Sequence, residues 1–520
     1  MNHDRIISTS TRRTTGTLSA LAALCLVLSG CHVGPKYTKP AVVAPPEFKE
    51  SAPAAYTTAG SGTWQPAHPQ DAALKGKWWE VFNEPELNAL EEQLDINNQN
   101  LAQFFQNFMA ARAQVRQARA GYFPTLSVAP SYSRQHSPDT LRGVGVAGSS
   151  GATSTGGGTS TSLQLPFDVS WEPDLWGRIS SQVHEFQYAA QVSAADLENE
   201  RLSEQASLAE FYFELRGQDA LQDVFNQTIE ADRKSLELTR TLVETGIDSP
   251  ESVAQAEVTL ANAEETAAGI ATNRAIYEHA IATLIGKPAS SFSLPVKALS
   301  TPVPPIPVGV PSQLLQRRPD IAAAERTMAQ ANAVIGIEKA AYYPSLSLTG
   351  AGGLGSSTIT SLFSVPALLW SVGASASETI FDAGLRQATV AQYTANYNAD
   401  VASYRQTVLT AFQQVEDYIA TLRVLSQQTT KQDVAIDAAQ RYLTIANSRY
   451  QTGLDPYLNV ISAQTTLLSD QQTRVTLQVN QMTAAVELIQ ALGGGWDVTN
   501  LPTPAKVATA DGERQVTNTP

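Results

Sequence analysis

Residues 120–128 read AGYFPTLSV, and the chain returns to this stretch at 340–348 as AAYYPSLSL. A second motif behaves in the same way, since TGID at 245–248 comes back as TGLD at 452–455. A duplicated unit of about 200 residues is typical of an architecture built by repetition. We therefore expect the function to lie in the duplicated frame rather than in an active site.

The offset between the two copies is 220 at Tyr122 and Tyr342 but 207 at Gly246 and Gly453. Copy two is therefore 13 residues shorter, and the loss falls where copy one holds a run of Gly, Ser and Thr at 143–158. That composition is typical of a flexible loop. Loops thus vary between the copies, whereas the helices keep their length.

Composition argues against several classes of protein. Charged residues make up 16% of the chain and the net charge is -14, so a basic surface for nucleic acid is not expected. The stretch GVGVAG at 143–148 matches GxGxxG, but no strand leads into it and no helix opens after it. The six histidines are scattered without metal-ligand spacing. We predict no enzyme, no cofactor and no metal site.

The N-terminus reads as an export signal over residues 1–30, with three arginines before the apolar run 18–28. It ends in LSGC, so Cys31 is the predicted site of cleavage and lipidation. The alternative is an ordinary cleaved signal with an incidental cysteine. His32, rather than aspartate, follows Cys31, which resembles lipoproteins sent to the outer membrane. Residues 31–84, rich in Pro, Ala and Thr, are expected to form a lipid-anchored tether.

Each copy carries two candidate strands, at 125–134 and 162–171 in the first and at 345–353 and 370–381 in the second. The strand 162–171 alternates without a break, with apolar residues at every second position: Leu163, Leu165, Phe167, Val169 and Trp171. This period of two is typical of a transmembrane barrel strand, although a soluble sandwich strand is the alternative. Four strands cannot enclose a lumen, so a barrel would need several chains.

Very long helices follow each strand pair. We predict helices at 85–121, 178–244 and 386–450, the last without Pro or Gly and with apolar residues in steps of three and four. Partner helices return at 251–285 and 457–492. Each pair forms an antiparallel hairpin with a Gly at its tip.

The domains follow from these elements. Repeat 1 covers 85–286 and repeat 2 covers 312–497, each as a helix, a β-hairpin and a long helical hairpin. The segment 287–311 holds seven prolines and is predicted to be a stiff linker. The tail 498–520 is expected to be disordered.

With these pieces in order, the chain resembles the TolC-like outer-membrane factors of tripartite efflux systems, and more closely their NodT-type lipoproteins. Five stretches carry the resemblance over nearly the whole mature chain: CHVGPKYTKP at 31–40, WWEVF at 78–82, LLQRRPDI at 314–321, FDAG at 381–384 and ALGGGW at 491–496.

The resemblance implies a mainly α protein with a transmembrane β portion. It implies a homotrimer in which 12 strands form one barrel in outer-membrane lipid and 12 helices form a tunnel across the periplasm. It further implies two partners, a periplasmic adaptor protein and an inner-membrane efflux pump. Matched by position, the adaptor-contacting hairpin tips are Thr245, Gly246 and Ile247 in copy one and Thr452, Gly453 and Leu454 in copy two.

The family closes its periplasmic end just after the second tip, commonly with a Leu, an Asp four residues later and an Arg three beyond. The matching positions here are Leu458, Ser462 and Thr465, so the chain departs at two of three. We expect a gate held by apolar contact and hydrogen bonds. The alternative is that Leu458 packs inside its own hairpin.

Two functions of different classes remain at this point. The first is a passive export duct powered by its partners. The second is a lipid-anchored periplasmic coiled-coil scaffold or adaptor, which would carry one helical hairpin flanked by β-rich halves rather than two hairpins and two strand pairs.

Overall fold

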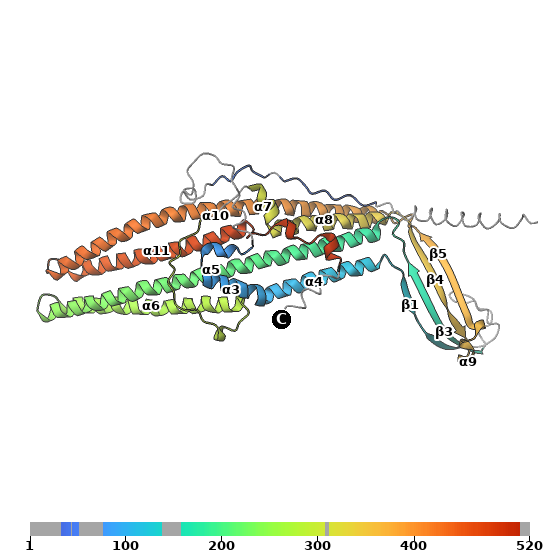
Figure 1. The fold of residues 1–520 in the computed structure, drawn as a ribbon, viewed down its shortest axis with the longest axis horizontal. Coiled ribbons are helices and arrows are strands. Elements are labelled where there is room, and N and C mark those ends of the chain that lie inside the picture. Colours follow the sequence, from blue (N-terminus) through green and yellow to red (C-terminus); the bar gives the residue numbers. More distant parts are fainter. Residues whose placement is uncertain (1–32, 43, 51–75, 138–157, 307–310, 510–520) are drawn as a thin grey trace, which may run out of the picture.

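The protein is a long rod of helices with a small sheet at one end (Figure 1). The computed structural model describes residues 33–42, 44–50, 76–137, 158–306 and 311–509. The predicted signal, Cys31 and the Gly-rich loop 143–157 lie outside these ranges. Among the described helices, none has an apolar stretch long enough to cross a membrane.

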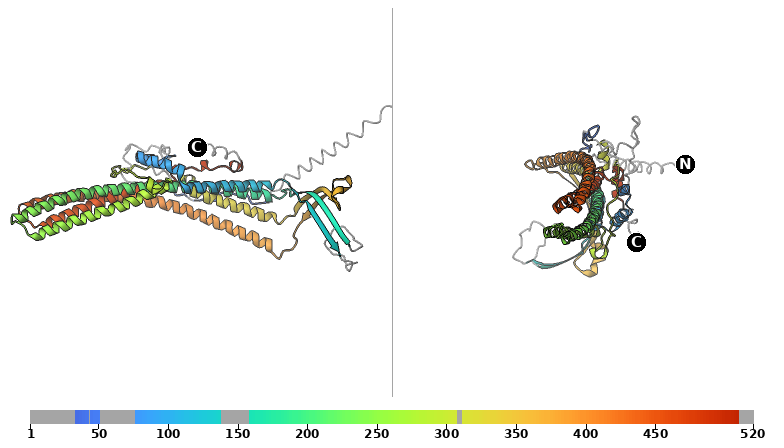
Figure 2. Two further views of the ribbon diagram at one scale, coloured as in Figure 1. Left: turned by 90° about the horizontal axis from the view of Figure 1, so that it is seen from below. Right: turned by 90° about the vertical axis from the view of Figure 1, so that its left-hand side faces the viewer.

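Two helical hairpins make up the rod. Helix α5 (Arg178–Glu244) and helix α10 (Leu385–Gln451) each have 67 residues, which is about 100 Å at ~1.5 Å per residue. Helices α6 (Pro250–Leu284) and α11 (Tyr457–Ala491) return along the halves of α5 and α10 that lie far from the sheet (Figure 1). The long-helix predictions are confirmed to within one residue at each end. Seen along the rod, the four helices follow a curved line rather than closing into a bundle (Figure 2).

The two hairpins approach closely at Gly217 of α5. A Cβ added there would lie 2.4 Å from a methyl carbon of Val479 on α11. No side chain fits at this distance. Because Gly217 has none, α5 and α11 can pack closely together. This contact holds copy one against copy two within the chain.

Shorter helices pack in the half of the rod next to the sheet (Figure 1). Helix α8 (Pro319–Ala340) packs against α5 and α10, and helix α4 (Gln99–Ala120) packs against α5. A short helix, α7 (Pro311–Arg317), precedes α8 and ends where Pro319 begins the new helix.

The prediction of one helix over 85–121 is wrong. The chain breaks at Asn98 into α3 (Pro85–Asn97) and α4, because Asn98 has extended backbone angles and its side chain accepts a hydrogen bond from the N–H of Leu101 at 3.0 Å. Asparagine is a preferred N-cap for this reason. The Asn98 amide also donates to the carbonyl of Leu284 at 2.9 Å, which fixes the break against the end of α6.

The sheet is antiparallel, in the order β1-β3-β4-β5, with β2 also paired to β3. The strands are β1 (Thr125–Val128), β2 (Ser131–Ser137), β3 (Gly158–Trp171), β4 (Ser345–Ser356) and β5 (Leu368–Ser377). Copy one and copy two meet at the β3–β4 pair, where Val169 lies opposite Gly350.

All four predicted strands differ from the observed ones in their bounds. β3 begins at Gly158 rather than 162, and β4 continues to Ser356 rather than 353. The predicted strand 125–134 is divided at Ala129 and Pro130, because proline has no N–H to donate to β3. β1 and β2 still follow one line along β3 and together act as a single edge. The predicted strand 370–381 begins earlier, at Leu368, and ends at Ser377.

The quoted motifs form the corners between helix and sheet. In copy one the indole N–H of Trp171 donates to the carbonyl of Tyr122 at 3.0 Å. In copy two the indole N–H of Trp176 donates to the carbonyl of Pro344 at 2.8 Å, and its ring stacks on Tyr343 with centroids 4.8 Å apart. A tryptophan of copy one thus closes each of the two corners.

The sheet leaves large apolar side chains in the open. Leu126 and Tyr132 on the first edge are 69% and 63% exposed, and Trp370 and Val372 on β5 are 75% and 82% exposed. In the described strands, neither the β1–β2 edge nor the β5 edge has a pairing partner on its outer side. Such a sheet is incomplete as it stands, since free edges and bare apolar faces favour association.

The N-terminal segment is extended, as expected of a tether, but it lies along the helices. The Tyr37 hydroxyl donates to Glu325 of α8 at 2.6 Å, and the Asn332 amide donates to the carbonyl of Pro35 at 2.9 Å. Further down, Glu50 pairs with Arg423 of α10 at 2.6 Å. The segment therefore ties α8 to α10 on the outside of copy two.

The prediction of a disordered tail is wrong for residues 498–509. These residues form two short helices, η6 (Val498–Asn500) and α12 (Pro504–Val507). Val507 is 1% exposed and packs with Val115 of α4 and Ala190 of α5. Polar composition concealed this docking, because the tail is held largely by its backbone carbonyls, for example by that of Ala508, which accepts from Arg119 at 3.2 Å. Residues 510–520 lie outside the described ranges.

Candidate functional site at the hairpin ends

Each hairpin turns at a glycine in the left-handed backbone region. Gly246 has φ 75° and Gly453 has φ 70°, a conformation that favours glycine. In both turns the third residue after the helix donates back into it, Ile247 to the carbonyl of Leu242 and Leu454 to that of Arg449, each at 2.9 Å. The repeat thus produces the same helix stop twice.

The two turns lie side by side, because a Cβ added to Gly453 would come within 3.9 Å of the Ile247 side chain. Ile247 and Leu454 are 62% and 68% exposed. The predicted tip residues Thr245–Ile247 and Thr452–Leu454 therefore form one end of the molecule, with two apolar side chains facing outward.

Two tyrosines of copy two bind copy one just behind the turns. Tyr450, at the end of α10, donates to the carboxylate of Asp248 at 2.7 Å and lies 3.1 Å from the hydroxyl of Thr239. Tyr457, at the start of α11, lies 3.1 Å from the hydroxyl of Ser235 on α5. The sequence analysis missed the two tyrosines, although Tyr450 lies two residues before TGLD and Asp248 is the last residue of TGID.

Beneath these bonds lies an apolar cluster to which all four helices contribute, called the tip cluster here. Its buried members are Leu236, Leu242, Ala256, Ala446, Tyr450, Tyr457, Val460 and Ala463. The rings of Tyr450 and Tyr457 lie 5.2 Å apart within it. The hairpins are therefore joined at their ends by apolar packing and by a few hydrogen bonds.

The Asp248 carboxylate is arranged to stay ionised. Burial acts to raise its pKa, but hydrogen bonds from Tyr450, from the Ser249 N–H and from Ser252 outweigh burial and hold this pKa below its ordinary value. A hydrogen bond to a charged acceptor is among the stronger kinds. The Tyr450–Asp248 bond is thus the strongest polar link that we find between the described parts of the two hairpins near their tips.

The equivalent aspartate of copy two, Asp455, has a partner within its own hairpin. Asp455 is paired with Arg449 of its own hairpin, with N···O distances of 2.6 and 3.0 Å. The position of Arg449 is occupied by Leu242 in copy one, so copy one has no such partner there. One aspartate therefore joins the hairpins, and its repeat stabilises a single turn.

The predicted gate residues lie on α11 immediately after the second turn. Leu458, Ser462 and Thr465 are all exposed and, being four and three residues apart, share one face of the helix. Leu458 is 60% exposed, so the alternative that it packs inside its own hairpin is wrong. Within this chain the three side chains point away from the core.

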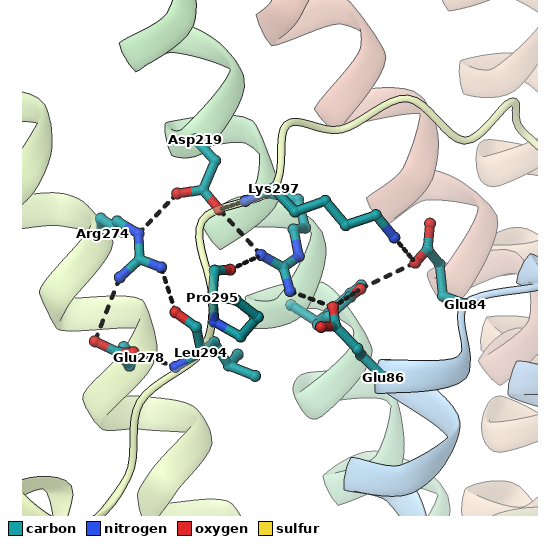
Figure 3. Close-up of polar contacts among 10 residues, drawn as sticks. Glu84, Glu86, Asp219, Arg274, Glu278, Leu294, Pro295 and Lys297 are labelled. Carbon is teal, nitrogen blue, oxygen red and sulfur yellow. Dashed lines mark hydrogen bonds and ion pairs between the residues drawn. The ribbon is translucent and has the colours of Figure 1, made fainter.

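A buried network of charges holds the middle of the rod (Figure 3). The guanidinium of Arg216 on α5 is 2% exposed and contacts Asp219 at 3.0 Å and Glu86 at 2.5 Å. It also donates to the carbonyl of Pro295 at 2.6 Å. Asp219 binds Arg274 of α6 at 2.7 Å as well. The network therefore fastens the proline-rich linker and the start of α3 to the first hairpin.

The rest of the network secures the linker on its other side. Lys297 donates to Glu84 at 2.8 Å, and the backbone N–H of Leu294 donates to Glu278 at 2.6 Å. In the described ranges, no group of three or more His, Cys, Asp and Glu is arranged to hold a metal ion. The network joins the linker and the start of α3 to the first hairpin and is called the clamp here.

A family model described as outer membrane efflux protein matches residues 90–287 and 310–494. These ranges span both repeats from α3 to the end of α11. The chain belongs to the outer membrane efflux protein family.

Curated relatives agree along the whole length. The toluene efflux pump outer membrane protein TtgC of Pseudomonas putida is 31% identical over 485 residues, covering 93% of this chain and 96% of that protein. The pyoverdine export outer membrane protein OpmQ of Pseudomonas aeruginosa is 28% identical over 485 residues, with 92% and 96% covered. This chain is thus an outer-membrane efflux protein, the channel component of a tripartite pump.

Solved structures show the same architecture. The outer-membrane channel OprN matches with a TM-score of 0.79 at 27% identity and covers 90% of this chain and all of that one. The Campylobacter jejuni channel CmeC also gives a TM-score of 0.79, over 94% and 98% of the two chains, and at 20% identity it supports the fold alone. The predicted TolC-like fold is confirmed.

We predict that Arg216→Met lowers the free energy of unfolding by about 1–3 kcal/mol, because Asp219 loses one of its two ion pairs and the carbonyl of Pro295 loses its donor. Thermal unfolding of the purified protein, followed by circular dichroism, measures the loss. The matched control is Arg233→Met, whose pair with Glu264 is exposed and should contribute about 0–1 kcal/mol. Equal shifts in the two variants would contradict a structural role of the buried clamp.

We predict that Tyr450→Phe weakens the contact between the hairpin ends by about 1.5–3 kcal/mol, the range for a hydrogen bond to a charged group. The fraction of time that single channels spend open in planar bilayers should then increase. Tyr442→Phe is the control, since Tyr442 is an exposed tyrosine of the same helix. An open fraction that stays at the wild-type value in Tyr450→Phe would show that Asp248 does not restrain opening.

Proposed function

We propose that three copies of this chain form one passive duct, closed at the hairpin ends and opened there by a periplasmic adaptor protein. The single observation that carries the proposal is the pair of free sheet edges at one end of an open, curved row of helices. Both features become complete only when further copies are added around a common axis.

Strand number supports three copies. β1 and β2 act as one edge strand, so each chain supplies four strands, and closed barrels of this kind begin near eight. Three chains would give a barrel of 12 strands, the number that the resemblance implies. The apolar side chains of the sheet, Trp370 and Val372 among them, would then contact outer-membrane lipid.

The hairpin ends are the proposed contact with the adaptor. Ile247 and Leu454 offer exposed apolar side chains next to each other, and the turns around Gly246 and Gly453 fix their positions. An inner-membrane efflux pump would supply the energy and the cargo. The scaffold alternative loses its support, because the chain has two hairpins and belongs to a family of channels.

The proposed gate is the exposed face of α11 that begins at Leu458. Three copies of Leu458 would meet on the axis and close it by apolar contact, with the hydroxyls of Ser462 and Thr465 above them. Neither hydroxyl can ionise at physiological pH, so the gate would lack the ionic pairs that an Asp and an Arg at these positions would make.

Leu458→Ala tests this proposal. The single-channel conductance of the purified trimer in planar bilayers should rise severalfold, because the smaller side chains leave an aperture on the axis. Leu454→Ala is the matched control, since it removes an exposed leucine of the tip without altering the gate. An unchanged conductance in Leu458→Ala would remove this residue from the gate, and a monomer without channel activity would refute the duct.

We further propose that Cys31 is lipidated and anchors the extended segment that runs along α8. Cells grown with labelled palmitate should incorporate label into the wild-type chain. Cys31→Ser should abolish the label and leave the trimer intact, because the barrel strands themselves would hold the protein in the membrane. Label that persists in Cys31→Ser would place the lipid elsewhere.

A further inference from the structure

An aspartate lies buried between the two hairpins without a partner. Asp232 of α5 is 3% exposed, and neither of its carboxylate oxygens has a hydrogen-bond partner. Acidic side chains are rarely buried unless they are paired, because an unpaired charge away from water is costly. A residue of this kind inside a coiled-coil seam therefore needs a functional explanation.

Its position on α5 shows which way it faces. Asp232 is seven residues before Thr239 and three before Ser235, so the three share one face of the helix. Thr239 and Ser235 bind Tyr450 and Tyr457 of the second hairpin. Asp232 therefore points at the contact between the two hairpins rather than into the first hairpin alone.

Apolar groups lie on both sides of it. One turn toward the tip is Leu236, a member of the tip cluster. Two turns the other way is Phe225, which forms a separate cluster with Ala267 and Ile270 of α6. Asp232 thus places an unpaired acid between two apolar clusters, at the level where the hairpins would part if their ends moved.

The repeat supplies an internal comparison. The offset of 207 places Ala439 of α10 opposite Asp232 in the alignment of the copies, and Ala439 is 6% exposed. The second copy therefore fills this seam position with a small apolar side chain. The helix packs at this position without an acid in copy two, so packing does not explain the aspartate of copy one.

We propose that Asp232 is a positioning residue for opening, which keeps the contact between the hairpins weak enough for the adaptor to separate them. The inference rests on the proposed gating at the hairpin ends. While the hairpins are packed, the carboxylate is cut off from water. When they separate it is hydrated, so its charge favours the open arrangement.

Few other charges act on this carboxylate. Titratable groups on the neighbouring helices include Tyr457 of α11, Tyr450, Asp437 and Arg441 of α10, and Glu257 and Glu264 of α6. The two glutamates pair with Arg240 and Arg233 of α5 on the outer surface. Burial alone raises the pKa of Asp232 to about 6, and the charge of Asp232 adds to the burial that raises the pKa of Tyr457.

The direction of the pH effect follows from this burial. The packed state holds the proton up to about pH 6, whereas a hydrated aspartate releases it near 3.8. Raising the pH from about 4 to 6 therefore favours separated hairpins, by up to roughly 100-fold for each protomer, and above pH 6 the effect is constant. Asp248 does not interfere, because its pKa lies below 3.8 and it stays ionised throughout.

The test compares the open fraction of purified trimers in planar bilayers at pH 4.5 and pH 7.5. Wild type should open more at pH 7.5. Asp232→Ala, which installs the residue of copy two, should open at least tenfold less at pH 7.5 and should lose the difference between the two pH values. Asp232→Asn keeps the size of the side chain and should also lose the pH dependence.

The opposite change should have the opposite effect. Ala439→Asp places a second buried acid in the seam and should raise the open fraction at pH 7.5. Glu237→Gln is the control for net charge, since Glu237 is an exposed acid one turn from Asp232 and its loss should leave the pH dependence intact.

Two results would overturn the inference, and they differ. If Asp232→Ala and Asp232→Asn match wild type while Tyr450→Phe and Leu458→Ala still open the channel, the gate is correct and Asp232 has no part in it. If none of these four variants changes the open fraction or the conductance, gating at the hairpin ends is itself refuted.

Discussion

The sheet has two edges whose backbone groups have no partner within the described chain. The rest of the structure depends on how these groups form their hydrogen bonds. Backbone groups must be satisfied wherever water is excluded, and in the proposed trimer strands of the neighbouring copies would satisfy these edges. The corners at Tyr122 and Tyr342 then set the directions in which the helices leave the sheet. β1, β3, β4 and β5 are each joined by a short turn to a long helix, so the curvature of the sheet and the arrangement of the helices depend on each other.

The two ends of each hairpin have different stabilities for physical reasons. At the middle of the rod, Arg216 and Asp219 are buried and each is bound by several partners, so the loss of one contact leaves the others in place. At the tips, the hairpins share an apolar cluster and a few hydrogen bonds near solvent. The clamp can therefore serve as the fixed point about which the tips move.

The sequence predicted most of the helices, because apolar residues recur in steps of three and four for nearly 70 residues. It did not predict the break at Asn98, because one capping amide outweighs an otherwise continuous helical pattern. It also missed the docking of residues 498–509. Polar composition describes side chains, whereas this segment is held by its backbone carbonyls and by one buried valine, Val507.

The candidate site was predictable in part for a similar reason. Turn glycines such as Gly246 and Gly453 are visible in any sequence, since the left-handed conformation restricts the choice of residue. Side chains that join two hairpins are not visible, because their partners are about 200 residues away. Tyr450 binds Asp248 only after both copies have folded, and no local pattern marks such a pair.

Duplication explains why the two hairpins are alike, and the departures from it show what was added afterwards. Both hairpins have an ion pair between their two helices, Arg240 with Glu257 in copy one and Arg474 with Asp433 in copy two. The turn aspartate of copy one, Asp248, is used to hold copy two, whereas Asp455 holds only Arg449. The second hairpin is thus restrained mainly by contacts that can be broken one at a time. In the proposed duct the second hairpin carries the gate residue Leu458, so its displacement would open the duct while the first hairpin stays in place.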